Sequence, residues 1–332
     1  MTAYSQFSDL SYTTAAAIYV LAMLFVLVEQ AFGRVARQRV AQRDLAKQRA
    51  LVGAGAPVAD GDGADATHDA AVPAAPSAGR PASGRPERFG RMGIALMVLG
   101  ALLHVAALVL RGLAAGRAPW GNMYEYLMAL SLVAVVTWLV LVRKYPLRHL
   151  TAFVLLPVVF LMFVGGTLYV EAGPLVPALQ SYWLVIHVAA AIVASGMFLV
   201  PGVASVLYLM RTANEGNPRR FRRLAERLPG KDVLDRIAYR TSVLAFPIYT
   251  FGVFAGAIWA ESAWGRFWDW DPKETVSFVA WVIYAAYLHA RATAGWRGKP
   301  AAWINTAGFA CIVFNFFFIN LVTAGLHSYA GV

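Results

Sequence analysis

The sequence is poor in charged residues and almost free of cysteine. Only 14% of its 332 residues are charged, 59% are hydrophobic, and Cys311 is the single cysteine. Because a soluble domain carries about 25% charged residues, this composition excludes an ordinary soluble chain. One cysteine also excludes an internal disulfide framework, a CxxC redox pair and a cysteine-based metal site.

Acidic residues are missing from the interior of the long hydrophobic runs. Glu29, Glu125 and Glu171 all lie at the ends of such runs. Carboxylates within a membrane mark proton and cation pathways. Their absence therefore argues against a proton- or sodium-coupled transporter.

Uncharged runs long enough to cross a bilayer recur eight times. A bilayer core of about 30 Å needs roughly 20 apolar residues in a helix. The pattern therefore predicts an all-α integral membrane protein with about eight transmembrane helices. The runs are residues 10–28, 92–110, 126–142, 150–170, 181–210, 241–260, 275–290 and 301–326.

The basic residues indicate the orientation of these spans. An even number of spans places both ends of the chain on one side, and 25 of the 29 Lys and Arg residues lie in the connections on the opposite side. The positive-inside rule makes that basic side cytoplasmic, so we expect both termini outside, in the plasma membrane. The net charge of +11 is then a topology signal and does not indicate nucleic-acid binding.

The chain divides into three parts by composition. Residues 1–32 hold the first span, residues 33–90 a cytoplasmic basic segment and a linker, and residues 91–332 the other seven spans. Within the second part, residues 51–86 are rich in Ala, Gly, Pro and Asp. They cannot bury a core, so we expect disorder there, and His68 within them has no evident role.

The densest motif is WGRFWDWDPKET, residues 264–275, in the outer loop before the seventh span. Part of this motif can be explained as the N-terminal cap of a helix. Asp271 is a good N-cap, Pro272 suits the first helical position, and Glu274 completes a capping box. The motif therefore predicts where the seventh span begins.

The tryptophans of this motif have a second interpretation. Tryptophan is common at membrane interfaces, but Trp264, Trp268 and Trp270 are concentrated within seven residues and together offer a flat aromatic surface. Beside Arg266 and Lys273, such a surface suits a ligand that is planar and apolar with an anionic rim. Haem with its two propionates fits this description.

The outer loop before the third span holds two more of the few outer basic residues. Arg111 and Arg117 are candidates for pairing with propionates. Asn122 and Glu125 are spaced as another capping box. The alternative interpretation is therefore that this loop only caps the start of the third span.

Two histidines are expected at the same depth, near the outer surface. His187 lies about two turns into the fifth span from its outer end, and His327 follows the outer end of the eighth. Neutral imidazole is a common metal ligand, and these two are level enough to bind one haem iron. The alternative is a pair of interfacial histidines that bond to headgroups or loops. His289 lies toward the cytoplasmic end of the seventh span, and we expect His104 to be a packed core residue.

The motif at residues 264–275 resembles the tryptophan-rich WWD signature of haem-handling proteins in cytochrome c maturation. With eight spans, the chain is similar to the CcsA/ResC-type subunit of the System II cytochrome c synthase, a subunit called CcsB in some bacteria. Supporting segments are PWGNMYE, SYWLVIHV around His187, WVIYAAYLHAR around His289 and GLHSY around His327. Val276 stands where this family often has another tryptophan.

The resemblance implies roles for these residues. His187 and His327 would be axial ligands of haem b at an external site that includes Asp271 and the three tryptophans, with Arg266 or Arg111 near the propionates. His289 would be a ligand of a second haem position within the membrane. The other ligand of that inner haem would come from a CcsB/ResB-type membrane partner.

The resemblance also implies a function. The chain would deliver haem across the bilayer and present it on the extracytoplasmic face for thioether attachment to the CxxCH motifs of apocytochrome c. It would act within a synthase (haem lyase) complex that depends on a thiol-reducing membrane system. Two alternatives remain open: a haem exporter or binding subunit without synthase activity, and a non-haem membrane transporter.

Overall fold

The computed structural model describes residues 3–53, 85–175, 177–293, 295–320, 322–323 and 325–327. Within these residues the chain is helical and contains no strand. The long helices are α1 (Ala3–Gly53), α2 (Arg85–Ala115), α3 (Met123–Lys144), α4 (Thr151–Thr167), α5 (Tyr182–Gly216), α7 (Lys231–Trp264), α8 (Pro272–Thr293) and α9 (Lys299–Phe314). Short elements are η1 (Arg148–Leu150), η2 (Pro177–Leu179), α6 (Arg222–Ala225) and the π-helical turn η3 (Asn315–Ile319).

Seven of the described helices are long and apolar enough to cross a membrane. They are α1, α2, α3, α4 with η1, α5, α7, and α9 with η3, which confirms the predicted all-α integral membrane protein. The remaining predicted span corresponds to α8. Its 22 residues extend about 33 Å, enough for a bilayer core, but its tyrosines, His289 and Arg291 make it less apolar than the others.

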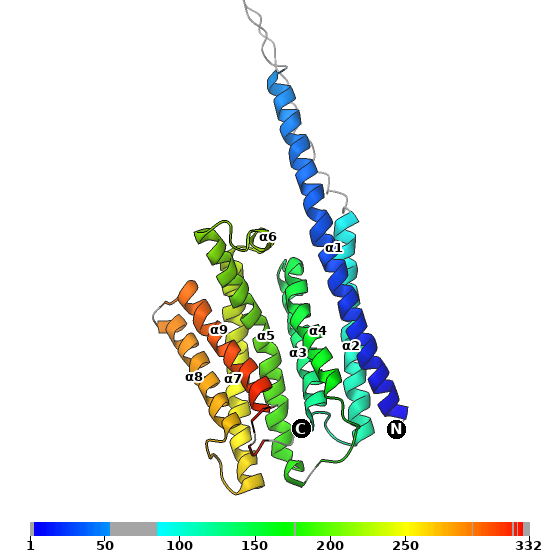
Figure 1. Ribbon diagram of the computed structural model, residues 1–332, viewed down its shortest axis with the longest axis vertical. Coiled ribbons are helices and arrows are strands. Elements are labelled where there is room, and N and C mark those ends of the chain that lie inside the picture. Colours follow the sequence, from blue (N-terminus) through cyan, green and yellow to red (C-terminus); the bar gives the residue numbers. More distant parts are fainter. Residues whose placement is uncertain are drawn as a thin grey trace, which may run out of the picture.

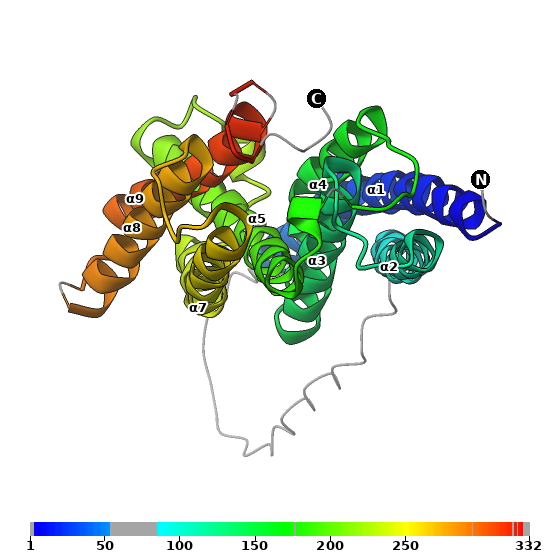
Figure 2. The same ribbon diagram turned by 90° about the horizontal axis from the view of Figure 1, so that it is seen from below.

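The helices form a bundle in which successive long helices run in opposite directions (Figure 1). Helices α1 and α2 pack together at one side, α3 and α4 in the middle, and α8 and α9 at the other side, with α5 packed on α7 (Figure 2). We call the end that holds residues 116–122 and 265–271 the tryptophan-loop end. The start of α1 and residues 325–327 also lie there, so both ends of the described chain share one side of the bundle.

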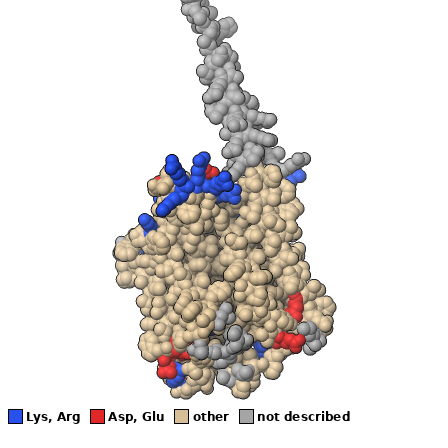
Figure 3. All heavy atoms as spheres, in the orientation of Figure 1, with Lys and Arg blue, Asp and Glu red and all other residues tan. Residues whose placement is uncertain are grey.

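The opposite end of the bundle is basic, and we call it the arginine-loop end after its connection at residues 217–230. Lys and Arg side chains gather there on the surface (Figure 3). Helix α1 continues beyond its span to Gly53, so the first half of the basic segment is helical. His68 and most of the predicted linker at residues 51–86 lie outside the described residues.

The core of the bundle contains one of the histidines. His104 of α2 is fully buried, and its ring centroid lies 5.7 Å from that of Tyr12 and 5.9 Å from that of Tyr19. The Tyr19 hydroxyl lies 3.4 Å from His104 Nδ1. His104 is thus a packed core residue, as expected.

Close approach of α1 to α2 depends on small residues. A Cβ at Gly93 would lie 2.8 Å from Val26 Cγ2 and 3.1 Å from the carbonyl oxygen of Ala22. Because small residues allow helix backbones to approach in membranes, we expect this contact to tolerate no larger side chain.

Replacing Gly93 by Leu tests this packing. Overpacking a tight contact costs about 1–3 kcal/mol, so the melting temperature of the full chain in detergent should fall, as measured by size-exclusion chromatography after heating. The matched control is Gly166→Leu, since no neighbouring helix lies within 4 Å of a Cβ at that position. An equal fall in the melting temperatures of the two variants would contradict close packing of α1 on α2 at Gly93.

Candidate functional site: a cavity lined by two histidines

A cavity of about 370 Å³ lies near the tryptophan-loop end. Its walls come from α3, α4, α5, α7, α8, α9, η2 and η3, together with the loops before α3 and α8 and the chain beyond η3, and most of the lining side chains are apolar. Among the lining residues are His187, Trp259, Trp268, Lys273 and His327. An apolar cavity with a few convergent polar groups is typical of a small-molecule site.

His187 enters this cavity from α5 and is fixed by α7. Its Nδ1 lies 2.7 Å from the carbonyl oxygen of Gly252, so Nδ1 carries the proton and the lone pair of the neutral ring is on Nε2. The ring stacks on Trp259 with centroids 6.0 Å apart and planes 11° apart. A Cβ at Gly256 would lie 2.6 Å from His187 Nδ1, so this turn of α7 leaves room for the imidazole only because residue 256 is glycine.

His327 reaches the same cavity from the chain beyond α9 and is held by Asp271. Its Nδ1 lies 2.9 Å from Asp271 Oδ2. Asp271 Oδ1 accepts a hydrogen bond of 2.8 Å from the Leu326 N–H. A carboxylate bonded to one imidazole nitrogen orients the ring and raises the basicity of the other nitrogen. The sequence expectation that His187 and His327 lie at one level therefore agrees with their place in one cavity.

The charges of this pair follow from their surroundings. Burial by itself would raise the pKa of Asp271, but the hydrogen bonds from His327 and from the Leu326 N–H outweigh it and lower that pKa to about 2. Burial lowers the pKa of His327, with the bond to Asp271 opposing it. At neutral pH the carboxylate is therefore ionised and the imidazole neutral, with its proton on Nδ1.

The same aspartate begins α8. Its Oδ2 accepts a hydrogen bond of 3.2 Å from the Lys273 N–H. Glu274 Oε2 accepts hydrogen bonds from the N–H groups of Asp269 at 3.0 Å and Asp271 at 3.3 Å. The predicted capping box is present, and it fixes the loop relative to α8.

The three tryptophans of the motif do not form a single platform, contrary to expectation. Trp268 lines the cavity, whereas Trp264 presents its ring to His327 with centroids 5.0 Å apart. Trp270 is 65% exposed, because its left-handed backbone, with φ of 59°, directs the chain into the cap of α8. Trp270 is absent from the cavity lining, and its ring makes an edge contact with that of Trp268 at 5.9 Å between centroids.

A tryptophan outside the motif is central to the site. Trp259 of α7 is buried, stacks on His187 and meets His327 at 5.8 Å between ring centroids. It also contacts Trp264 at 4.8 Å. Sequence reasoning missed Trp259 because it lies within a uniformly apolar run that carries no motif.

The two arginines expected near propionates lie outside the cavity lining. Arg266 forms ion pairs with Asp269 at 3.3 Å and Glu274 at 3.9 Å, and its guanidinium lies over the Trp264 ring at 5.6 Å. Lys273 lines the cavity instead, where its Nζ bonds to Asn320 Oδ1.

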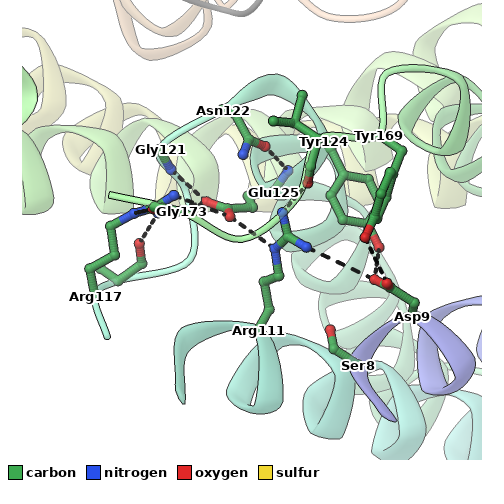
Figure 4. Close-up of polar contacts among 12 residues, drawn as sticks. Ser8, Asp9, Arg111, Arg117, Gly121, Asn122, Tyr124, Glu125, Tyr169 and Gly173 are labelled. Atoms are coloured by element: carbon green, nitrogen blue, oxygen red, sulfur yellow. Dashed lines mark hydrogen bonds and ion pairs between the residues drawn. The ribbon is translucent and has the colours of Figure 1, made fainter. Parts of the chain in front are cut away.

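Arg111 is enclosed by protein (Figure 4). Its Nε donates to Glu125 Oε1 at 3.0 Å, and its guanidinium lies over the rings of Tyr124 at 5.1 Å and Tyr169 at 5.6 Å. Asp9 of α1 lies 4.0 Å away. Arg111 is fully buried where α1, α2 and α3 meet and does not line the cavity, so the structure does not support it as a partner for propionates.

Glu125 connects this ionic cluster to the cavity wall (Figure 4). Its Oε2 accepts hydrogen bonds of 2.8 Å from Arg117 Nη1 and from the Gly121 N–H. Asn122 Oδ1 accepts a 2.9 Å bond from the Glu125 N–H, as the second predicted capping box requires. Because Trp120, Gly121 and Asn122 line the cavity, the cluster fixes that part of its wall.

His289 is separate from the cavity. It lies on α8 with an exposed side chain and does not belong to the cavity lining. The structure thus brings His187 and His327 together and leaves His289 on a surface of the bundle.

The fold and site define a multi-pass membrane protein with a histidine- and tryptophan-lined cavity at one end. Residues 120–327 match the model of the family described as cytochrome C assembly protein. The chain belongs to this family, in agreement with the predicted resemblance to CcsA-type proteins, and it is a protein of cytochrome c biogenesis.

Relatives and a solved structure show the same likeness. The chain is 35% identical over 242 residues to the cytochrome c biogenesis protein CcsA of Chlamydomonas reinhardtii, covering 70% of this chain and 67% of that protein. It is 34% identical over 273 residues to CcsA of Synechococcus sp. strain RCC307, covering 74% and 88%. The structure of cytochrome c heme lyase CcmF shares the fold with a TM-score of 0.55 at 18% identity, and the match covers 96% of this chain and 47% of that one.

Replacing Glu125 by Gln tests the role of the ionic cluster. Removing one partner of a buried ion pair costs about 3–5 kcal/mol, because Arg111 and Arg117 lose their shared counter-charge. We expect a lower melting temperature of the full chain in detergent. Glu171→Gln is the control, since Glu171 is exposed. If the two variants melt alike, the cluster does not support the fold.

Proposed function

We propose that this chain binds haem b as substrate in the cavity, with His187 and His327 as the two iron ligands, and presents it for covalent attachment to apocytochrome c. One observation carries the proposal: two imidazoles line one apolar cavity, and each has its Nδ1 bonded to a protein acceptor. In both rings the lone pair is then on Nε2, the nitrogen that a metal takes up.

The rest of the cavity supports a planar, amphipathic ligand. Trp120, Trp259 and Trp268 offer aromatic faces and edges, and aromatic rings pack well in offset or edge-to-face arrangements. Lys273 supplies a cationic group within the lining for a propionate. This assignment replaces Arg266 and Arg111, because neither of them lines the cavity.

The proposed setting is the plasma membrane, with the cavity at the extracytoplasmic face. The basic side chains at the arginine-loop end support this orientation through the positive-inside rule. His289, exposed on α8, suits a ligand of an inner haem position that a CcsB/ResB-type partner completes. Haem would pass from that position to the cavity at the tryptophan-loop end.

The chemistry of attachment needs positioning more than catalysis by side chains. Each thiol of the CxxCH segment adds across a haem vinyl group: a C–S bond forms and the thiol hydrogen goes to the other vinyl carbon. Holding the vinyl groups beside the thiols can supply several kcal/mol of the barrier, and the haem supplies the reactivity. The thiols must be reduced, hence the expected thiol-reducing membrane system.

Synthase activity is proposed as a property of the complex and not of this chain alone. The chain spans about half the length of the heme lyase that shares its fold. Haem binding without synthase activity is therefore the second candidate function. Haem attachment assayed with and without the membrane partner separates the two.

Replacing each histidine by Ala tests the site. His187→Ala and His327→Ala should each lose most of the bound haem, measured by pyridine haemochrome on the full chain purified with its partner, and added imidazole should restore it. His289→Ala should reduce haem at the inner position and leave an external bis-histidine spectrum.

The control for these variants is His149→Ala, at the opposite end of the bundle. It should retain haem like the unmodified chain. A colourless unmodified complex, or retention of full haem content by His187→Ala and His327→Ala, would refute haem binding at this cavity.

Replacing Asp271 by Asn tests how His327 is oriented. Asn retains size and a capping oxygen but loses the negative charge that faces the imidazole. Loss of such an orienting group lowers metal affinity by about 10–100-fold, so haem binding in a titration should weaken by a factor of this order. Asp269→Asn is the control, because this carboxylate is 66% exposed. Equal affinity in the two variants would exclude an orienting role.

A further inference from the structure

A second cavity, of about 350 Å³, lies toward the arginine-loop end. Helices α4, α5, α6 and α9 contribute its walls, and all seven lining side chains are apolar. They are Phe153, Val203, Val206, Leu207, Met210, Leu224 and Phe309. An apolar ligand of hydrocarbon character suits such a lining, because no polar side chain there needs a partner.

Four arginines are close in sequence to Leu224, one of the residues that line this cavity. Leu224, one of the lining residues, lies in α6 directly after Arg222 and Arg223, and Arg219 and Arg220 precede them in the connection. All four arginines are exposed, and they belong to the basic surface at this end of the molecule (Figure 3). We call these four exposed arginines, which are close in sequence to a lining residue, the cationic rim of the cavity.

The rim is held in place by α5. Arg211 Nη1 donates hydrogen bonds to the carbonyl oxygens of Ala225 at 3.2 Å and Leu228 at 2.6 Å. Arg211 directly follows Met210, another lining residue. Phe221, between the two pairs of arginines, is 48% exposed, with a left-handed φ of 50° that turns the chain there.

We propose that the cavity and its rim bind one anionic phospholipid of the adjacent leaflet. An acyl chain occupies the apolar cavity, and the phosphate of the headgroup pairs with Arg220 and Arg223. Arginine is well suited to phosphate, and basic groups next to a membrane span favour anionic lipids. Haem fits less well, because the lining offers no imidazole for its iron.

The lipid site borders the cavity of the two histidines. Phe309 lines both cavities, and its ring is packed against α5, where a Cβ at Gly202 would lie 2.2 Å from Phe309 Cγ. An acyl chain would support this ring from the inner side. Lipid binding itself does not require haem.

Native mass spectrometry of the full chain provides the test. Phosphatidylglycerol and phosphatidylcholine with identical acyl chains are added separately to delipidated protein. We expect one phosphatidylglycerol to be retained under conditions that remove phosphatidylcholine. The double substitution Arg220→Gln with Arg223→Gln should weaken phosphatidylglycerol binding by about tenfold or more, and Leu224→Trp should reduce it by filling the cavity.

The control removes the same amount of charge at the same end of the bundle. Arg143→Gln with Lys144→Gln replaces two exposed cations and should leave phosphatidylglycerol binding unchanged. The four substituted basic side chains are exposed, so their loss leaves the core intact. The proposal would be overturned if the protein retained the two lipids equally, or if the two double variants lost phosphatidylglycerol binding to the same extent. Displacement of phosphatidylglycerol by stoichiometric haem would also overturn it.

Discussion

The hydrogen bonds of one carboxylate, Asp271, organise the candidate site. This group accepts from the ring of His327, from the Leu326 N–H and from the Lys273 N–H. The chain beyond α9, the first turn of α8 and the tryptophan-rich loop are therefore joined at a single point. A buried carboxylate is unfavourable by itself, and these three donors stabilise its ionised form. The bond to Asp271 adds to the ring contacts of His327 with Trp259 and Trp264 in positioning this histidine at the cavity.

The two histidines are fixed in different ways that give the same chemical result. His187 is held by a backbone carbonyl of α7 and by the face of Trp259, whereas His327 is held by a carboxylate and by the ring of Trp264. Buried polar groups need partners in an apolar environment. Those partners fix the tautomer as well, so each imidazole has its lone pair on Nε2.

Ionic groups at the tryptophan-loop end support the cavity without lining it. Arg111 and Arg117 both donate to Glu125, which also accepts from the Gly121 N–H. Together they hold the loop before α3, whose Trp120 and Asn122 form part of the wall. This placement keeps most of the cavity apolar, while both arginines pair with Glu125.

Much of the fold could be predicted from the sequence, because a bilayer requires apolar runs of a certain length and the capping boxes at Asn122 and Asp271 fix two helix starts. The common level of His187 and His327 followed from counting residues along the spans. Trp259 could not be found this way, since nothing distinguishes it from its apolar neighbours in α7.

The burial of Arg111 could not be predicted from the sequence either. Two of its contacts, Asp9 and the carbonyl of Val170, are far away along the chain and meet it only after the helices have packed. The outward direction of Trp270 depends on a left-handed backbone conformation, which its residue type does not favour. Each of these departures arises from tertiary contacts or loop geometry, which residue type and spacing do not encode.

The most direct test of the central claim is electron paramagnetic resonance of the full chain loaded with ferric haem, with histidine nitrogens labelled with the isotope ¹⁵N. Two imidazole ligands on one iron predict a low-spin signal with hyperfine coupling to two histidine nitrogens bound to the metal. A high-spin signal, or coupling to fewer than two histidines, would contradict the assignment of His187 and His327 as a pair of iron ligands.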